Sequence, residues 1–525
     1  MVLQFFFPSL PSGLFFHPAP PLNSPFLALA RPLPPSTNNS SMIKLSDPMA
    51  QVIILGFICF CCPGMYNALQ GTGTYGLSAK DSDVGNSANT ALSVVFAFSS
   101  LFAGALFNIL GHRILLILGG LSYALYIGSF LAYNSIHSIV FVVLASCLLG
   151  VGAGWLWCAQ GAVMIGYPEE SEKGKYFSIF WAIFNLGGVL GNVIPLGIQW
   201  SDEKAGGATD ASYIGYMVVM TVGALMTVLL LPASKVVRKD GSPVIKIKYS
   251  SPLSELKSVF ALFKDWRMLS LTPLFFASNW FYTYQFTAVN AFNFSSRTRL
   301  MNSMLYWLAQ IFASVAYGAF LDHAQWTRQV RARYGLILLT VVLIATWVGG
   351  AIFQTTFGPK NAVFDKELGL YVKNVEDFHA IDLVHNTGEY IGPFFLYFCY
   401  GVADSMYQGY SYWLMGALTN DTNQAARFAG FYKFMQNLGG ILAPVVQTSR
   451  IGNGPKNGDN ALNAVGAGIG EFIICVVLVF VGVIGAIPVA LKAVKNHTVE
   501  EDDVVKEKQD AVIDEKRDAS FEVHA

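Results

Sequence analysis

Twelve side chains that are costly to bury in a membrane occur within long apolar stretches of the chain. They are amides, tyrosines and one acid–base couple, in chain order Asn67, Gln70, Gln160, Asn279, Tyr282, Gln285, Asp404, Tyr407, Gln408, Lys433, Gln436 and Asn437. Polar groups in such stretches often mark a solute pathway or a proton relay. We expect Asp404 to be the most important of them, as a contact to a solute or as a site that binds a coupling proton. The alternative is that the amides only join neighbouring helices.

The couple of Asp404 and Lys433 has two interpretations. Asp404 should lie ~18 Å from the cytoplasmic end of its helix and Lys433 ~9 Å, at 1.5 Å per residue. The long lysine stem spans part of this gap, so the two groups can form a pair. Alternatively, Lys433 extends to the cytoplasm and Asp404 alone faces water in a cavity. The sequence leaves both open.

The composition indicates an integral membrane protein. The chain has 525 residues, of which 54% are hydrophobic and 13% charged, whereas soluble proteins carry about 25% charged residues. The bilayer is therefore an expected partner. A net charge of +0 gives no sign of nucleic-acid binding.

Twelve stretches are long and apolar enough to be membrane helices, which need about 20 residues each. Their sequences do not alternate as the strands of a membrane barrel would. The predicted spans are 51–70, 89–109, 114–133, 138–160, 176–197, 213–232, 268–288, 303–321, 334–353, 391–415, 428–447 and 465–491.

The distribution of Lys and Arg predicts the orientation. One set of loops holds fifteen of them and the other nine, and the richer set should be cytoplasmic. With twelve spans, both termini are then cytoplasmic, in either the plasma membrane or an internal membrane. Residues 1–50 are rich in proline and are predicted to be disordered or to follow a start codon assigned too early. The charged tail 492–525 is predicted to be flexible.

Two segments repeat. "NLGGVL" at 185–190 returns as "NLGGIL" at 437–442, and "GALFN" at 104–108 returns as "GAFLD" at 318–322. The paired glycines are more consistent with close helix packing than with binding. The repeats predict two six-helix halves, 51–232 and 268–491, joined by a basic cytoplasmic linker, 233–267. Two parallel halves describe an all-α polytopic protein with the major facilitator fold, twelve transmembrane helices in two six-helix repeats.

The junction between the second and third spans resembles the loop signature of the major facilitator superfamily. That signature has a Gly, an acid, a second Gly and basic residues. The first copy here consists of Gly104, Asn108, Gly111 and Arg113, with Asn108 where the acid usually stands. The second copy keeps Gly318 and Asp322.

A narrower resemblance lies in "GFICFCCPGMYNALQGTG" of the first span and "GAGWLWCAQG" of the fourth, which are similar to the Unc-ninety-three-like family. Founding members of that family are implicated in potassium-channel regulation, and an animal relative in receptor trafficking. The resemblance implies the fold firmly and the molecular activity weakly. In the major facilitator fold, spans 1, 4, 7 and 10 line the central cavity, and these spans hold most of the polar residues named above.

No motif of an enzyme, a cofactor site or a metal site occurs, so the protein is not expected to be an enzyme. The favoured hypothesis is a secondary transporter of a small solute, with a proton as a possible coupling ion. The alternative hypothesis is a non-transporting regulatory or trafficking partner of other membrane proteins. The motif "NFS" makes Asn293 the expected glycosylation site of the body.

Overall fold

The computed structural model describes residues 44–71, 82–169, 171–201, 210–238, 244, 251–365, 370–373, 380–448 and 468–496. The first half of the chain contains α1 (Pro48–Cys59), η2 (Phe60–Gly64), α2 (Met65–Gly71), α3 (Ser82–Leu110), α4 (His112–Ile136), α5 (Ile139–Gly166), α6 (Lys173–Ser201), α7 (Asp210–Leu225), η4 (Met226–Leu229) and η5 (Ala233–Lys235). The second half contains α8 (Pro252–Ala261), η6 (Leu262–Lys264), α9 (Trp266–Tyr282), η7 (Thr283–Ala291), α10 (Ser296–Leu321), α11 (Arg328–Asn361), β1 (Ala362–Asp365), β2 (Leu370–Lys373), α12 (Thr387–Leu418), α13 (Thr422–Thr448), α15 (Ile469–Pro488) and η9 (Val489–Ala493).

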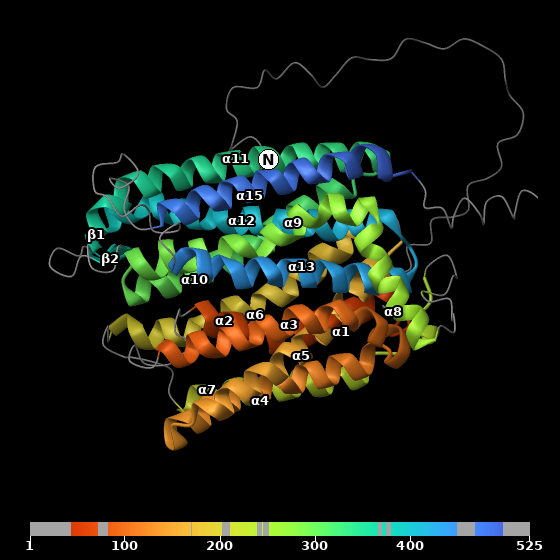
Figure 1. Ribbon diagram of the computed structural model, residues 1–525, viewed down its shortest axis with the longest axis horizontal. Coiled ribbons are helices and arrows are strands. Elements are labelled where there is room, and N and C mark those ends of the chain that lie inside the picture. The colour runs from red at the N-terminus through yellow and green to blue at the C-terminus, as the bar shows by residue number, and fades with distance from the viewer. Residues whose placement is uncertain are drawn as a thin grey trace, which may run out of the picture. The chain divides into compact units, whose positions relative to one another are not determined.

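Each of the twelve predicted spans coincides with a helical segment, and the long helices run side by side across Figure 1. In the described part of the chain, nine helices are long and apolar enough to cross a membrane. The other predicted spans correspond to α9, α12 and α13, which are rich in polar residues. The fold class is confirmed, and the count of twelve crossings stays a prediction.

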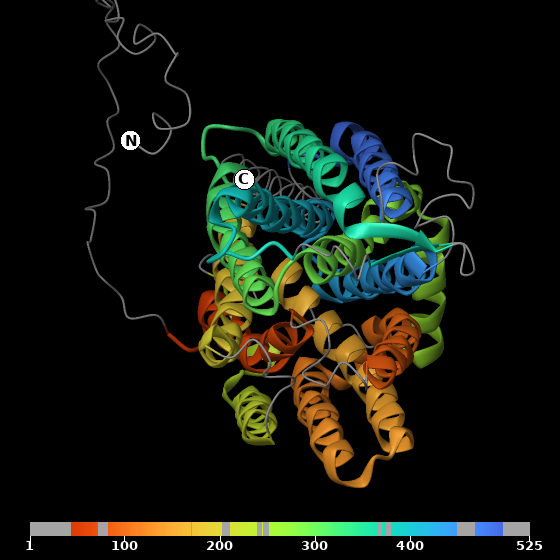
Figure 2. The ribbon, with the colours of Figure 1, turned by 90° about the vertical axis from the view of Figure 1, so that its left-hand side faces the viewer.

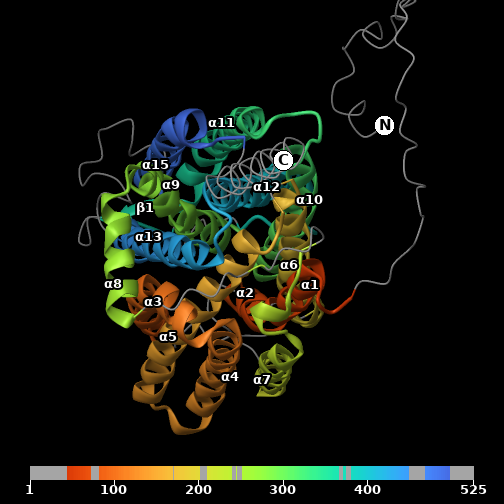
Figure 3. The same cartoon turned by 90° about the vertical axis from the view of Figure 1, so that its right-hand side faces the viewer.

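We call the two ends of the helices inner and outer, after their predicted sides. The inner end carries α8, and the outer end carries the antiparallel pair of β1 and β2, at opposite sides of Figure 1. The hairpin is an addition that the sequence did not predict. The views along the helices place α3, α4, α5 and α7 on one side and α9, α11, α12 and α15 on the other (Figures 2 and 3).

Contacts between the two halves of the chain join these sides. Helix α6 packs along α10, and α13 packs along both α3 and α5. The packing is close because glycines lie at the crossings. A Cβ on Gly104 would lie 2.9 Å from the carbonyl oxygen of Ala426, and one on Gly318 would lie 2.5 Å from that of Gly174. The repeated "GALFN" and "GAFLD" segments therefore occupy equivalent positions.

The second repeat has the same role in each copy. A Cβ on Gly187 of α6 would lie 2.5 Å from the carbonyl oxygen of Phe60, and one on Gly439 of α13 would overlap that of Phe276. Only glycine allows the backbones to approach so closely. The prediction that the paired glycines serve close packing is confirmed at these two positions.

Two of the helices that line the cavity described below are interrupted. The π-helical turn η2 contains Pro63, and proline interrupts a helix because it removes a backbone donor. The π-helical segment η7 continues α9. Such turns interrupt regular helical bonding and often accompany functional sites.

The predicted disorder of the N-terminus concerns residues that lie almost entirely outside the described ones. The same is true of the tail beyond residue 496. The predicted linker 233–267 is described at 233–238, 244 and 251–267, and it contains α8.

Candidate solute-binding cavity

A cavity of about 140 Å³ lies between helices of the two sides. It reaches from Lys433 and Gln436 in the middle of α13 to Asn67 and Gln70 in α2. The described residues that line it are Pro63, Tyr66, Asn67, Gln70, Asn89, Leu92, Ser93, Phe96, Tyr123, Leu149, Ala153, Trp157, Trp181, Phe184, Asn279, Tyr282, Trp307, Gln408, Lys433, Gln436 and Asn437. Eight of the predicted polar residues are among them.

Asp404 lies one layer behind this wall and is 1% exposed. Its Oδ2 accepts hydrogen bonds from the Tyr282 hydroxyl at 2.9 Å and the Gln310 amide at 2.9 Å. The Tyr306 hydroxyl has one proton and lies within hydrogen-bond distance of both Asp404 Oδ2, at 3.1 Å, and Gln285 Oε1, at 2.9 Å. Asp404 Oδ1 accepts from the Gln408 amide at 2.9 Å. All of these groups around Asp404 are neutral, so the carboxyl group is held by dipoles rather than by a cation.

Lys433 is 4% exposed and lies at the cavity wall. Its Nζ donates to Gln436 Oε1 at 2.7 Å. The same nitrogen lies 4.3 Å from the centre of the Trp157 ring and 5.0 Å from that of Tyr432. A lysine over aromatic faces gains a cation–π attraction.

Neither interpretation of the acid–base couple is correct. No ion pair joins Asp404 to Lys433 among the described residues; instead two amides connect them. Gln436 accepts from Lys433 and donates to Gln408 Oε1 at 3.2 Å, and Gln408 donates to Asp404. Lys433 does not extend to the inner surface, because its ammonium is bonded within the protein.

The other predicted residues divide into two groups. Asn67, Gln70 and Asn279 line the cavity without a hydrogen bond from their side chains to any described residue. The other group has partners within the protein. Gln285 accepts from the Tyr306 hydroxyl and Gln160 from the Tyr412 hydroxyl. The Asn437 amide donates to the carbonyl of Lys433. These three have structural contacts.

Tyr407 was wrongly placed at the solute path. Its side chain is fully buried, packs against Phe281 and lies close to Gly482 of α15. It faces away from the cavity because positions 407 and 408 lie on either side of position 404 around the helix, and Gln408 takes the inward side.

The sequence did not identify Tyr306 and Gln310 of α10. Gln310 donates to Asp404 and accepts from Trp181 Nε1 of α6 at 2.8 Å, so it joins the two sides at the acid. Their spacing of four residues, which places both side chains on one face of a helix, could have identified them from the sequence.

At the inner end, the Asn108 side chain bonds to a carboxylate that lies far from it in the sequence. Its amide donates to Glu255 of α8 at 2.8 Å. Glu255 is 2% exposed and accepts from Arg427 of α13 at 3.0 and 2.8 Å. Helix α8 lies beside α3 and α13 (Figure 3). The carboxylate that the first loop copy lacks is thus supplied by the linker.

The second loop copy uses its own acid. Asp322 accepts from the backbone N–H groups of Gly174 at 2.9 Å and Lys175 at 2.6 Å, at the start of α6. Burial raises the pKa of Asp322 to about 6, although these N–H groups act in the opposite direction. We call the Asn108–Glu255–Arg427 contact the first latch and the Asp322–α6 contact the second latch.

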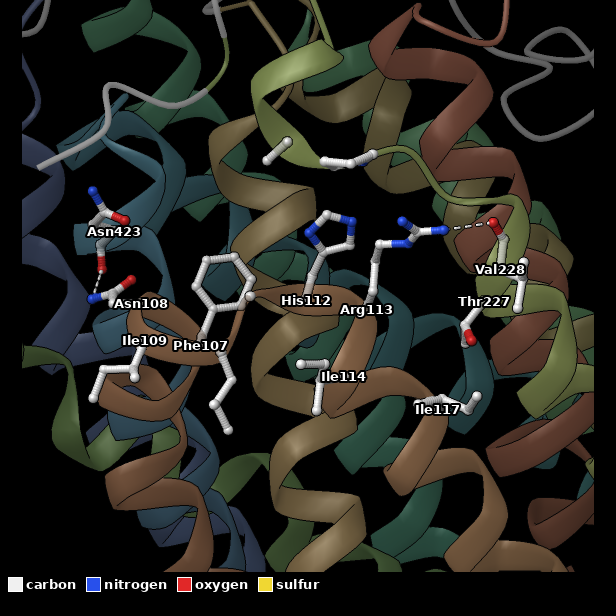
Figure 4. Close-up of a pocket in the computed structure, with 14 residues that line it drawn as sticks. Phe107, Asn108, Ile109, His112, Arg113, Ile114, Ile117, Thr227, Val228 and Asn423 are labelled. Atoms are coloured by element: carbon white, nitrogen blue, oxygen red, sulfur yellow. Dashed lines mark hydrogen bonds between the residues drawn. The ribbon is translucent and has the colours of Figure 1, made fainter. Parts of the chain in front are cut away.

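A larger cavity, of about 660 Å³, lies at the inner end beside the turn between α3 and α4 (Figure 4). There His112 contacts the carbonyl of Leu231 at 3.0 Å, and Arg113 donates to that of Val228 at 2.8 Å. These polar groups brace the turn against the end of the α7 segment. The cavity lies to the side of the interface, so it is a weaker candidate for a solute path.

The predicted glycosylation of Asn293 disagrees with its surroundings. The residue is 3% exposed, and its amide donates to the carbonyls of Ala288 and Val289. A glycan on this nitrogen would break both contacts. Beside it, Arg297 and Asp382 form a buried ion pair at 2.6 Å, which lowers the pKa of Asp382.

Comparison with known proteins identifies relatives across most of the chain. The model of a family described as ion channel regulatory protein UNC-93 matches residues 81–350. UNC93-like protein 1 of Arabidopsis thaliana is 40% identical over 412 residues, which cover 78% of this chain and 85% of that protein. UNC93-like protein C922.05c of Schizosaccharomyces pombe is 38% identical over 418 residues, covering 79% and 80%.

Two solved structures have a similar fold. The major facilitator superfamily transporter FucP in the outward conformation aligns with a TM-score of 0.54 at 13% identity, covering 84% of this chain and 99% of that one. The proton:xylose symporter XylE aligns with a TM-score of 0.56 at 12% identity, covering 87% and 98%. These similarities establish the major facilitator fold.

Proposed function

Because the chain belongs to the UNC-93 family within the major facilitator superfamily, we propose that it is a secondary transporter of a small solute. The observation that carries this proposal is the cavity between the two sides, whose wall includes polar groups without a hydrogen bond to a described residue. Polar groups enclosed in a membrane protein are costly unless they meet water or a ligand. Asn67, Gln70 and Asn279 are therefore available to a solute.

The proposed movement is a rocking of one half, 51–232, against the other, 268–491, about the cavity. The linker 233–267 and both termini would be cytoplasmic. Helix pairs α6–α10 and α3–α13 would then form the sliding surfaces. The two latches hold the inner end closed and would have to open in each cycle.

Asp404 supports coupling of this movement to a proton. As a carboxylate it only accepts hydrogen bonds; when protonated it must donate one, so at least one neighbouring group has to change from donor to acceptor or move away. Gln310 bonds both Asp404 and Trp181. A change of protonation at Asp404 would therefore alter a contact between α10 and α6, which belong to opposite halves.

The direct test is uptake by purified protein in liposomes, with a panel of labelled cationic, neutral and anionic small solutes. We expect at least one solute to accumulate above the level of protein-free liposomes. Asp404→Asn should abolish this accumulation, and the exposed Asp210→Asn at the start of α7 should preserve it. A folded parent protein that moves no member of the panel would contradict the proposal.

A second candidate function is regulation of another membrane protein, which the description of the matching family favours. In that case the cavity residues would be dispensable and the protein would act through a stable complex. Gentle purification followed by mass spectrometry would detect a stoichiometric channel or receptor. Unchanged partner function in the Asp404→Asn variant would favour this alternative.

A further inference from the structure

Among the described residues that line the cavity, Lys433 is the one with a formal charge. We propose that the cavity binds a small organic monoanion, a carboxylate on a single ring or short apolar body, with the carboxylate held by Lys433. This proposal rests on the transport function proposed above and adds the chemical class of the solute.

The ammonium of Lys433 has N–H donors that bond to no described group. It has three N–H donors, and its hydrogen bond to a described group is the one to Gln436. The rings of Trp157 and Tyr432 attract it but cannot neutralise it. Asp404 is separated from it by the side chains of Gln436 and Gln408.

A buried cation without an adjacent anion is costly, because little water remains to solvate it. A carboxylate that enters the cavity would supply the missing charge and accept one or two N–H groups. One cation balances one negative charge. A phosphate or a dicarboxylate would bring a second negative charge without a counterpart, so the argument favours a monoanion.

The size and the walls of the cavity limit the rest of the molecule. A volume of about 140 Å³ is close to the ~150 Å³ of an engineered protein cavity that binds benzene, which suits a single ring. Trp157, Trp181, Phe184 and Trp307 provide aromatic surface along the wall. A flat apolar body packs well against such surfaces.

Part of the cavity wall is polar. Asn67 and Gln70 of α2 and Asn279 of α9 are among the residues that line it. Amides donate and accept, so they can bind a hydroxyl or an amide on the body of the solute. The arrangement would therefore tolerate one neutral polar substituent in addition to the carboxylate.

The test compares binding of labelled benzoate and labelled benzamide, which have nearly the same shape but differ in charge, to the purified protein at pH 7. We expect saturable binding of benzoate at least tenfold tighter than that of benzamide. Equal affinities, tighter binding of benzamide, or no binding of benzoate would overturn the proposal. This comparison uses the parent protein and does not depend on the folding of a variant.

Variants then locate the site. Lys433→Gln should weaken benzoate binding at least tenfold and leave benzamide unchanged, and Lys433→Arg should retain most of the preference. The exposed Lys235→Gln is the matched control. An unchanged preference in folded Lys433→Gln would overturn the assignment of Lys433.

The outcome is separable from that of the transport proposal. If the liposomes accumulate neutral or cationic solutes in an Asp404-dependent manner but the protein does not bind benzoate, transport stands and the anion proposal fails. If no solute of any charge moves, the transport proposal fails.

Discussion

The inner end and the central cavity satisfy their polar groups in opposite ways. At the inner end, the carboxylates of Glu255 and Asp322 meet donors of fixed geometry, two from Arg427 and two from the backbone of α6. In the cavity, Asn67 and Asn279 have no hydrogen bond to a described residue. Polar groups with fixed partners hold one conformation, whereas the half-buried amides of Asn67 and Asn279 are available to a partner from outside. This difference supports the proposal that the inner end serves closure and the cavity serves binding.

The two latches also differ from each other. The second latch uses the acid of its own loop, and the first takes its acid from α8 of the linker. Both copies of the loop therefore contact a carboxylate, but the residue that supplies it differs between the copies. Under the proposed transport cycle, this difference would couple the linker to the closure of the first half.

The largest expected effect is at Asp404, whose buried carboxyl group accepts hydrogen bonds from Tyr282, Gln310 and Gln408. Asp404→Asn should reduce uptake at least tenfold, since an amide cannot accept at both positions and cannot exchange a proton. Abundance in the membrane should be unchanged. The measurement is initial uptake in liposomes, with Asp210→Asn as the control.

The double variant Asp404→Asn with Lys433→Gln sharpens this result. Because two amides separate the charges, removing the lysine should not restore uptake. Recovery in the double variant would show a direct pair and contradict the geometry.

The next largest effect is expected on protein stability when the first latch is broken. Glu255→Gln should lower stability by roughly 2 kcal/mol, less than the ~3–5 kcal/mol for a fully buried pair, because the Arg427 side chain is 20% exposed. Thermal melting in detergent would measure it. Asn108→Asp should also lower the melting temperature, since it places a second carboxylate beside Glu255.

Combining Asn108→Asp with Glu255→Gln returns the acid to the loop. This pair of changes should recover most of the melting temperature lost in either single variant. If Asn108→Asp alone stabilises the protein, Glu255 is not the substitute acid.

The second latch should respond to pH. The folded pKa of Asp322, about 6, lies above its ordinary value of 3.8. The stability that this group contributes is therefore fully present below pH 4 and is lost as the pH rises through 6. The melting temperature of the parent minus that of Asp322→Asn should be larger at pH 5 than at pH 8. A difference independent of pH would contradict this prediction.

The smallest effect is expected at Asn67. Asn67→Ala should leave the melting temperature unchanged and raise the solute concentration for half-maximal uptake by about two- to fivefold, as for one hydrogen bond of ~0.5–1 kcal/mol. Asn192→Ala is the contrast, because its buried amide donates to Gly188 and Ser303. It should lower the melting temperature. The reverse pattern would remove the distinction between binding and structural amides.

The fold was largely predictable from the sequence because apolar length and repeated glycine segments determine helices and their crossings. Asp404 was identified because an acid within an apolar stretch is conspicuous. Glu255 was not identified, since it lies in a polar linker among other charged residues. Its role becomes visible only from its contacts with Asn108 and Arg427 in the folded structure.

Other errors have similar causes. Tyr407 and Gln408 are adjacent, and helical periodicity alone cannot decide which of them faces the cavity. The direct pairing of Asp404 with Lys433 was considered without the glutamines between them, because depth along a helix says nothing about intervening side chains. The short strands of the hairpin, β1 and β2, are four residues each, too short to predict from alternation.

The most direct test of the account is to lock the inner end reversibly during transport. Asn108→Cys and Asn423→Cys would be introduced at a contact between α3 and α13, in a background with Cys147→Ser and Cys399→Ser, and joined by a short thiol cross-linker that a reductant cleaves. The account predicts that cross-linking stops uptake of the transported solute without abolishing its binding, and that reduction restores uptake. Uptake that continues at the parent rate in the cross-linked protein would contradict alternating access through this end.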